Sequence, residues 1–236
     1  MKIAAVCCTY LRPFALGELV RCFQYQDYPY RELIILDDAG QYEDGEGENW
    51  RLVSLSRRFA TLGEKRNAAA ALVSPDVEAL AVWDDDDLYL PWALSASVAA
   101  LRRAPWSRPS LVLHPTSDGS LRQHRTGGLF HGGWAYRRGL FQLLGGYAAV
   151  SNGEDQELAA RLARTHVGHA DPIRLGFRPF YVYRWAGGWH LSNLGLRGYQ
   201  RLGALRGGKT PLVAADPPGI DLRNPRILRG VYPRAF

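Results

Sequence analysis

Along the first hundred residues, short apolar runs alternate with segments whose apolar residues recur at helical spacing. The runs have the length and composition of buried strands in a parallel sheet, and they cover residues 2–8, 32–38, 52–55 and 79–83. The helical pattern covers residues 13–26, 63–73 and 92–103. Because strands that alternate with helices form a parallel sheet covered on both faces, the pattern predicts an α/β fold.

The pattern becomes irregular after residue 103. Short strands with glycine bends are expected at residues 111–114, 127–136 and 180–184, and short helices at 138–144 and 156–164. Residues 41–49 are acidic and rich in glycine, which is typical of a loop. We therefore expect a smaller mixed portion after the parallel sheet, and residues 198–236 receive no structural assignment.

Composition narrows the class of protein. The chain has 236 residues, 47% of them hydrophobic, which is enough for a substantial core. The longest apolar runs are too short to cross a membrane, so we expect a cytoplasmic, soluble protein. The cysteines are three, an odd number without metal-type spacing, which favours free thiols in a reducing compartment.

The formal charge of +6 is unevenly distributed. Residues 1–160 carry 16 Lys and Arg against 20 Asp and Glu, whereas residues 161–236 carry 13 against 3. Such a basic portion favours a polyanionic or membrane-surface partner. Arginine outnumbers lysine 26 to 3, however, so a GC-rich genome explains the excess equally well.

Polar clusters follow three of the predicted strands. They are Thr9-Tyr10 with Arg12, Asp37-Asp38, and the run of four carboxylates from Asp84 to Asp87. Ligands of parallel sheets gather at the carboxyl ends of the strands. Four adjacent carboxylates also require neutralisation, which a divalent cation or solvent commonly supplies. These clusters therefore indicate a binding site at this edge of the sheet.

Six motifs occur in a fixed order along the chain. They are Thr9-Tyr10-x-Arg12, Asp37-Asp38, Gly63-x-x-Arg66-Asn67, Asp84-x-Asp86-Asp87, Gly145-Gly146-Tyr147 and Glu154-Asp155-x-x-Leu158-x-x-Arg161. Together they resemble glycosyltransferase family 2 over residues 1–193. The resemblance implies a GT-A fold, with a Rossmann-like and mostly parallel sheet, and inverting transfer of a sugar from a nucleotide donor.

The resemblance assigns the donor site. Thr9, Tyr10 and Arg12 match its first nucleotide-binding turn, and Asp37-Asp38 its second. Asp37 matches a carboxylate that accepts the N3–H of a pyrimidine, which favours a UDP- or dTDP-sugar, although a cap after the strand is the alternative role. Arg66 matches an arginine beside the diphosphate, or it is a structural partner of Asp84 or Asp38. Lys65 departs from the family pattern and adds positive charge there.

The resemblance also implies a metal. Asp84 and Asp86 match its metal-binding motif, with Asp84 alternatively meeting the ribose, and Asp85 lies between them at the donor. Their hard oxygens suit Mn²⁺ or Mg²⁺. His190 matches a histidine that ligates metal or diphosphate in several members, or it is an ordinary packed residue.

The acceptor side is less fully assigned. Glu154-Asp155 matches the catalytic acidic pair, with Asp155 as the general base, although either carboxylate could simply complement the dipole at a helix start. His131 and Trp134 shape a sugar or acceptor pocket, with filling the core as the alternative role of Trp134.

We expect a single domain over residues 1–236, with donor binding in 1–103, acceptor binding and catalysis in 104–197, and a basic tail in 198–236. The expected acceptor is a surface glycan, a lipid-linked glycan or, because of the basic portion, DNA carrying hydroxymethylpyrimidines. A nucleotide-sugar-binding protein without activity is an alternative that the intact acidic motifs disfavour. A nucleotidyltransferase would show a glycine-rich phosphate loop near Arg12, which is absent.

Overall fold

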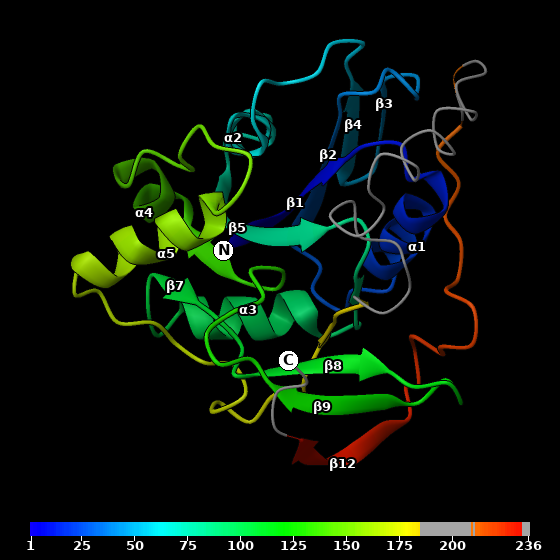
Figure 1. Ribbon diagram of the computed structural model, residues 1–236, viewed down its shortest axis with the longest axis vertical. Helices are drawn as coiled ribbons and strands as arrows, with labels where there is room; N and C mark the ends of the chain where they lie inside the picture. The colour runs from blue at the N-terminus through cyan, green and yellow to red at the C-terminus, as the bar shows by residue number, and fades with distance from the viewer. Residues whose placement is uncertain (185–208, 210, 233–236) are drawn as a thin grey trace.

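The computed structural model of the chain describes residues 1–184, 209 and 211–232. Its larger sheet has seven strands in the order β3-β4-β2-β1-β5-β10-β7 (Figure 1). The strands are β1 (Lys2–Thr9), β2 (Arg31–Asp37), β3 (Gly45–Gly47), β4 (Trp50–Ser54), β5 (Val77–Asp84), β7 (Trp106–Ser107) and β10 (Ala135–Arg137). The four central strands β4, β2, β1 and β5 are parallel, and β3, β10 and β7 extend them with antiparallel pairing. The expected α/β class is confirmed.

Helices cover both faces of this sheet. They are α1 (Pro13–Gln24), α2 (Leu62–Ala71), α3 (Ala93–Leu101), α4 (Arg138–Leu143) and α5 (Glu154–Arg164). Alternate residues of β1 point to opposite sides: Ile3 and Cys7 pack in one apolar cluster with α1 and α3, while Ala4 packs in a second cluster with α4 and α5. Burial on both faces explains why these strands are continuous apolar runs rather than alternating ones.

Local sequence signals set the start of α2. The Thr61 side chain accepts a hydrogen bond from the Glu64 backbone N–H, and Glu64 accepts one from that of Thr61, which forms a capping box. Gly63 then allows a close approach, because a Cβ there would lie 1.8 Å from the carbonyl oxygen of Ala148. The helix is thereby fixed against the segment that precedes α5.

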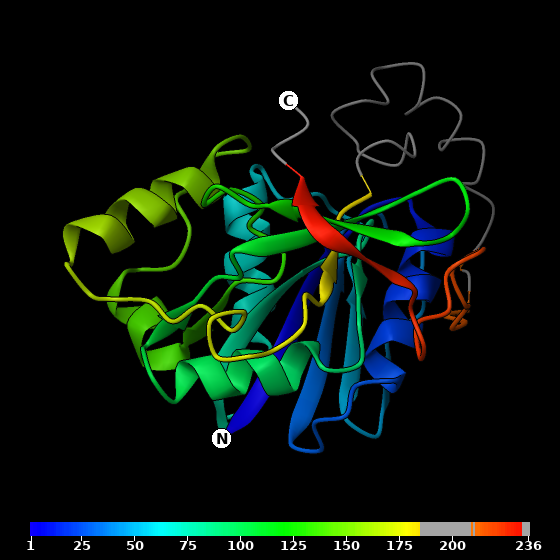
Figure 2. The same cartoon turned by 90° about the horizontal axis from the view of Figure 1, so that it is seen from below.

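A second, five-stranded sheet has the order β12-β9-β8-β11-β6. Its strands are β6 (Leu88–Tyr89), β8 (Leu111–Pro115), β9 (Leu121–Arg125), β11 (Tyr181–Val182) and β12 (Ile227–Tyr232). Figure 1 shows β8, β9 and β12 as a layer below the larger sheet, and Figure 2 shows β12 in red beside them. The sheets interleave in sequence, because β6 precedes residue 103 while β7 and β10 of the larger sheet follow it.

Several expectations about individual segments need correction or completion. Residues 41–49 are not simply a loop: they include β3, and Tyr42 is buried against the core. Within the tail, Ala215 donates a backbone hydrogen bond to Gly17 of α1, at 2.9 Å, before the chain enters β12. All three cysteines are free, as expected. Among the described residues, no helix is both long and apolar enough to cross a membrane.

Candidate functional site

A cleft of about 1600 Å³ opens at the carboxyl ends of the central strands. Its walls come from the turn after β1, the segment before α2, the acidic run after β5, the glycine-rich turn before β10 and the start of α5. Most of the motif residues line it, namely Thr9, Tyr10, Arg12, Asp38, Lys65, Arg66, Asp84, Asp85, Asp86, Asp87, Trp134 and Asp155. The topology therefore brings residues as far apart in the sequence as Cys8 and Tyr183 into one site.

Arginines neutralise the first three carboxylates of the acidic run. Arg66 Nη2 lies 2.9 Å from Asp84 Oδ1, and Arg12 lies 3.1 Å from Asp85 and 2.5 Å from Asp86. Thr9 also donates to Asp85 at 2.7 Å. The sequence suggested a divalent cation or solvent as the neutraliser of this run, whereas the structure shows that the chain supplies cations of its own.

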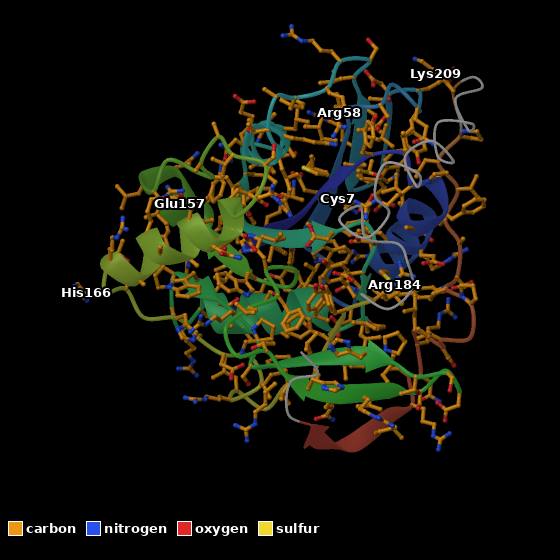
Figure 3. All side chains as sticks on the ribbon, viewed as in Figure 1. Cys7, Arg58, Glu157, His166, Arg184 and Lys209 are labelled. Carbon is orange, nitrogen blue, oxygen red and sulfur yellow. The ribbon has the colours of Figure 1, made fainter. Side chains whose placement is uncertain are left out.

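The fourth carboxylate is directed away from these arginines. Asp87 Oδ2 accepts from the Tyr181 hydroxyl at 2.5 Å, and Asp87 Oδ1 accepts from the Arg184 backbone N–H at 3.0 Å. The Arg184 side chain forms an ion pair with Glu18 of α1. Figure 3 shows Arg184 next to this helix. Asp87 therefore ties the acidic run to β11 and, through Arg184, to α1.

Burial and neighbouring charges separate the pKa values of these acids. Burial, with the adjacent Asp86 adding to it, raises the pKa of Asp87 well above its usual range. Burial likewise raises the pKa of Asp85 to about 6 although Arg12 opposes this. For Asp84 the desolvation is outweighed, mainly by Arg66, and its pKa is lowered. Asp84 is therefore held as a carboxylate at the cleft wall.

The structure places Asp37 in the turn after β2 and not in the cleft wall. This side chain is fully buried, and it accepts hydrogen bonds from the backbone N–H groups of Ala39 and Gln41 and from the Ser54 hydroxyl. Both carboxylate oxygens are used in closing the turn after β2, which is the capping alternative. Asp38, the next residue, is the one that lines the cleft.

Lys65 holds Asp38 in place. Its ammonium group lies 2.5 Å from Asp38 Oδ1 and donates to the Thr9 carbonyl at 2.6 Å, with both side chains of the ion pair almost fully buried. The lysine that departs from the family pattern therefore joins α2 to the ends of β1 and β2. Its charge is matched within the protein.

A cation–aromatic stack borders the same end of the cleft. The Arg58 guanidinium carbon lies 3.9 Å from the centre of the Tyr10 ring, and both residues line the cleft. Figure 3 shows Arg58 on the segment that leads into α2. No motif marks Arg58 in the sequence, and only the fold reveals its position.

The two acids at the start of α5 have different surroundings. Glu154 is buried and its Oε1 lies 3.2 Å from Arg66 Nε, while burial raises its pKa despite Arg66. Asp155 lines the cleft, half-buried, and its Oδ1 accepts only the backbone N–H of Gln156 in the described part of the chain. Glu154 thus orients Arg66, whereas Asp155 faces the space where a substrate would lie.

The donor set at the acidic run suits a divalent metal only in part. Within the described ranges, no three His, Cys, Asp or Glu side chains form a group that could hold a metal ion. His190 lies outside the described residues. Asp84 and Asp86 nevertheless present oxygens at the cleft, and Mg²⁺ or Mn²⁺ commonly binds through one or two carboxylates together with substrate phosphates. The two aspartates fit a metal that arrives with a phosphorylated ligand.

Several wall residues could not be found from motifs. They are Tyr181, Tyr183 and Arg58. Trp134 lines the cleft and, at 2% exposed, is also part of the second apolar cluster. Aromatic residues carry no periodic signal of their own, so their convergence follows only from the pairing of β10 with β5 and of β11 with β6.

No family model and no curated protein matches this sequence. Solved structures, in contrast, share its fold. S. aureus TarS 1-349 in complex with UDP-GlcNAc aligns with a TM-score of 0.58 at 16% identity, over 87% of this chain and 66% of that one. The mannosyltransferase PcManGT from Pyrobaculum calidifontis, in complex with GDP-Man and Mn²⁺, aligns with a TM-score of 0.56 at 18% identity, over 89% and 66%. The chain therefore has the GT-A fold, and it spans slightly less than two thirds of each of these proteins.

Proposed function

We propose that this protein is a glycosyltransferase that uses a nucleotide sugar. The observation that carries the proposal is the cleft itself, in which Arg12 and Arg66 lie beside a carboxylate run while Asp155 faces the same space from α5. The solved structures with this fold contain UDP-GlcNAc or GDP-Man. Fold and charge arrangement together favour this activity over a binding protein without catalysis.

The cationic groups suit a diphosphate. Carboxylates of the acidic run hold Arg12 and Arg66 at the cleft, and a bound anion would compete with these carboxylates for the two guanidinium groups. Arginine binds phosphate oxygens through two parallel N–H donors. Asp38 and the Arg58–Tyr10 stack border the end of the cleft next to β2, where a base would lie. We infer that Asp38 is the carboxylate nearer a bound base, because it lines the cleft and Asp37 does not. A pyrimidine N–H would share its oxygens with Lys65 and the Phe59 backbone N–H.

Asp84 and Asp86 are the residues that would hold Mn²⁺ or Mg²⁺. When bound, the metal would neutralise charge that develops on the departing nucleoside diphosphate. Arg66, fixed between Asp84 and Glu154, would contribute to the same stabilisation without a metal.

Asp155 is the proposed general base. Its carboxylate would take the proton of an acceptor hydroxyl as that oxygen bonds to the anomeric carbon and the nucleoside diphosphate leaves. Because this is one displacement, the anomeric configuration inverts. A glycan or lipid-linked glycan is the proposed acceptor class. The strongly basic composition of residues 161–236 makes DNA the second candidate.

Calorimetry and donor turnover test the proposal directly. UDP, UDP-GlcNAc, GDP and GDP-mannose would be titrated into the protein with Mn²⁺, and release of the free nucleotide from each sugar donor would be followed over hours. Binding of a nucleotide and its sugar donor, UDP with UDP-GlcNAc or GDP with GDP-mannose, together with slow release of the free nucleotide from that donor, supports a glycosyltransferase. Binding without release, in the presence of glycan and hydroxymethylpyrimidine DNA acceptors, would favour the inactive alternative, and no binding would reject both.

A further inference from the structure

Two neighbouring residues of the cleft wall each carry a buried nitrogen without a partner among the described residues. They are His131, through Nδ1, and Trp134, through Nε1. The residues are 7% and 2% exposed, and their ring centres lie 5.1 Å apart. An unpartnered buried polar atom is costly, so such atoms mark places where a water or a ligand completes the structure.

The other side of the histidine is fixed. His131 Nε2 lies 2.8 Å from the Tyr147 hydroxyl, and the backbone of Tyr147 exchanges two hydrogen bonds with the Asn67 side chain. The imidazole is also kept neutral, because burial and then Arg66 lower the pKa of His131 to about 3. A fixed, neutral ring with one nitrogen in use leaves Nδ1 as a hydrogen-bonding group of defined position.

The chemistry of the two nitrogens selects the ligand group. An indole N–H only donates, whereas the second nitrogen of a neutral imidazole accepts or donates according to the tautomer. A hydroxyl can accept from Trp134 and at the same time exchange a hydrogen bond with His131. A carboxylate or carbonyl could satisfy the tryptophan but could not serve as a donor to an accepting Nδ1.

The surroundings select the part of the substrate. His131 interacts electrostatically with Arg66, which is proposed to contact the diphosphate, and with its ion-pair partner Asp84. The sugar of a nucleotide sugar is attached to that diphosphate. We propose that His131 and Trp134 form a subsite that binds one hydroxyl of the donor sugar, an inference that rests on the proposed function.

Two substitutions remove one nitrogen each. Trp134→Phe keeps an aromatic ring and removes the N–H, and His131→Gln keeps a group near Nε2 and removes the one at Nδ1. The matched control is Trp106→Phe, because the Trp106 ring lies 5.5 Å from that of Trp134 but its N–H is already bonded to the Val167 carbonyl, at 3.1 Å, away from the cleft. His131→Asn is the rescue variant, since its amide lies near the position of Nδ1.

The measured quantity is the ratio of Kd for the nucleotide sugar to Kd for the nucleotide alone, with UDP-GlcNAc and UDP or GDP-mannose and GDP as the probes. We expect the ratio to rise about 5- to 10-fold in Trp134→Phe and His131→Gln, as for one lost hydrogen bond, and to stay near the wild-type value in Trp106→Phe and His131→Asn. Binding of the nucleotide alone should be unchanged throughout.

The thermal midpoint provides an independent readout. Trp134→Phe removes a donor that has no partner, so it should lower the Tm less than Trp106→Phe, which removes a bonded one. An unchanged Kd ratio in both cleft variants would overturn the subsite while leaving the proposed function intact, and would assign the two nitrogens to a structural water. Failure of the wild-type protein to bind any of the four nucleotides would instead reject the proposed function together with the subsite.

Discussion

Asn67 and Tyr147 exchange two hydrogen bonds of 2.8 Å, from the Asn67 amide to the Tyr147 carbonyl and from the Tyr147 backbone N–H back to the amide oxygen. This contact joins two motifs that lie 80 residues apart in the sequence. Gly146 is part of the arrangement, because it has φ of +71° and a Cβ there would lie 2.4 Å from Asn67 Oδ1. The pair positions Arg66 on one side and the Tyr147–His131 bond on the other.

Replacing Asn67 with Ala should therefore destabilise the fold by about 1–3 kcal/mol, because two backbone groups lose their partner. Urea denaturation followed by fluorescence measures the change. Asn67→Asp is a useful comparison, since it keeps the acceptor for Tyr147 N–H but loses the donor to the Tyr147 carbonyl, and it should lie between Ala and the wild type. Equal stability of all three proteins would show that the contact has no energetic role.

Asp155→Asn should abolish transfer while leaving donor binding intact. The change keeps the side-chain volume and removes the proton acceptor, which is worth roughly 10²–10⁴ in rate. Turnover and UDP affinity would be measured on the same preparation. Glu154→Gln is the matched variant: it weakens the contact with Arg66 and should affect donor binding, so a larger loss of rate from Glu154→Gln than from Asp155→Asn would move the base to Glu154.

Metal dependence is expected in the binding of UDP or GDP. EDTA should weaken nucleotide affinity in the wild-type protein, and Asp84→Asn and Asp86→Asn should each remove most of this effect, because these two carboxylates are the proposed metal ligands. Asp85→Asn is the internal control, since Asp85 is 1% exposed and already bonded to Thr9 and Arg12. Identical affinities with and without EDTA in the wild type would reject the metal assignment.

The sequence was sufficient for the central sheet and for most of the cleft, because both depend on local rules. Buried parallel strands read as apolar runs, and their carboxyl ends share one edge wherever the helices between them pack. It was insufficient for the choice between Asp37 and Asp38. Adjacent carboxylates have the same local pattern, and only the turn geometry decides that Asp37 closes the turn while Asp38 faces the cleft.

The same limit of local sequence patterns applies to the partners of the acidic run, Asp84 to Asp87. The resemblance assigned Asp84 and Asp86 to a metal and left Arg66 as a possible partner of Asp84, but nothing in the sequence placed Arg12 opposite Asp85 and Asp86. Arg12 follows β1, which pairs in parallel with β5, and Arg66 is in α2, which packs against β1, so strand register and helix packing together bring the two arginines to the end of β5. Long-range register of this kind cannot be read from local periodicity.

The buried ion pair between Lys65 and Asp38 should be strongly coupled. Lys65→Met leaves the Asp38 carboxylate buried without its main partner and should destabilise the fold by about 3–5 kcal/mol, whereas Lys65→Met combined with Asp38→Asn should be less harmful than the single change. The surface pair of Arg161 and Glu157 provides the control, because breaking it with Glu157→Gln should change stability by about 1 kcal/mol or less. Additive effects at the Lys65–Asp38 pair would contradict the coupling.

His131 should lower the free energy of unfolding as the pH becomes acidic. Its pKa is lowered to about 3 in the folded protein by burial and by Arg66, against about 6.5 when unfolded. Between these values the unfolded chain binds a proton that the folded chain does not, so the contribution of His131 to stability decreases as the pH falls below about 6.5. The raised pKa values of Asp85 and Glu154 act in the opposite direction, because the folded protein then holds protons that the unfolded chain releases.

The total pH profile therefore does not isolate the histidine, but the difference between the wild type and His131→Gln does. Gln cannot titrate, so the stability advantage of the wild type over His131→Gln should shrink by roughly 2–3 kcal/mol between pH 7 and pH 4.5, at about 1.4 kcal/mol per pH unit. Urea denaturation at intervals of half a pH unit measures both curves. A constant difference across this range would mean that His131 has the same pKa in the folded and unfolded protein, and burial would then not be what keeps its imidazole neutral.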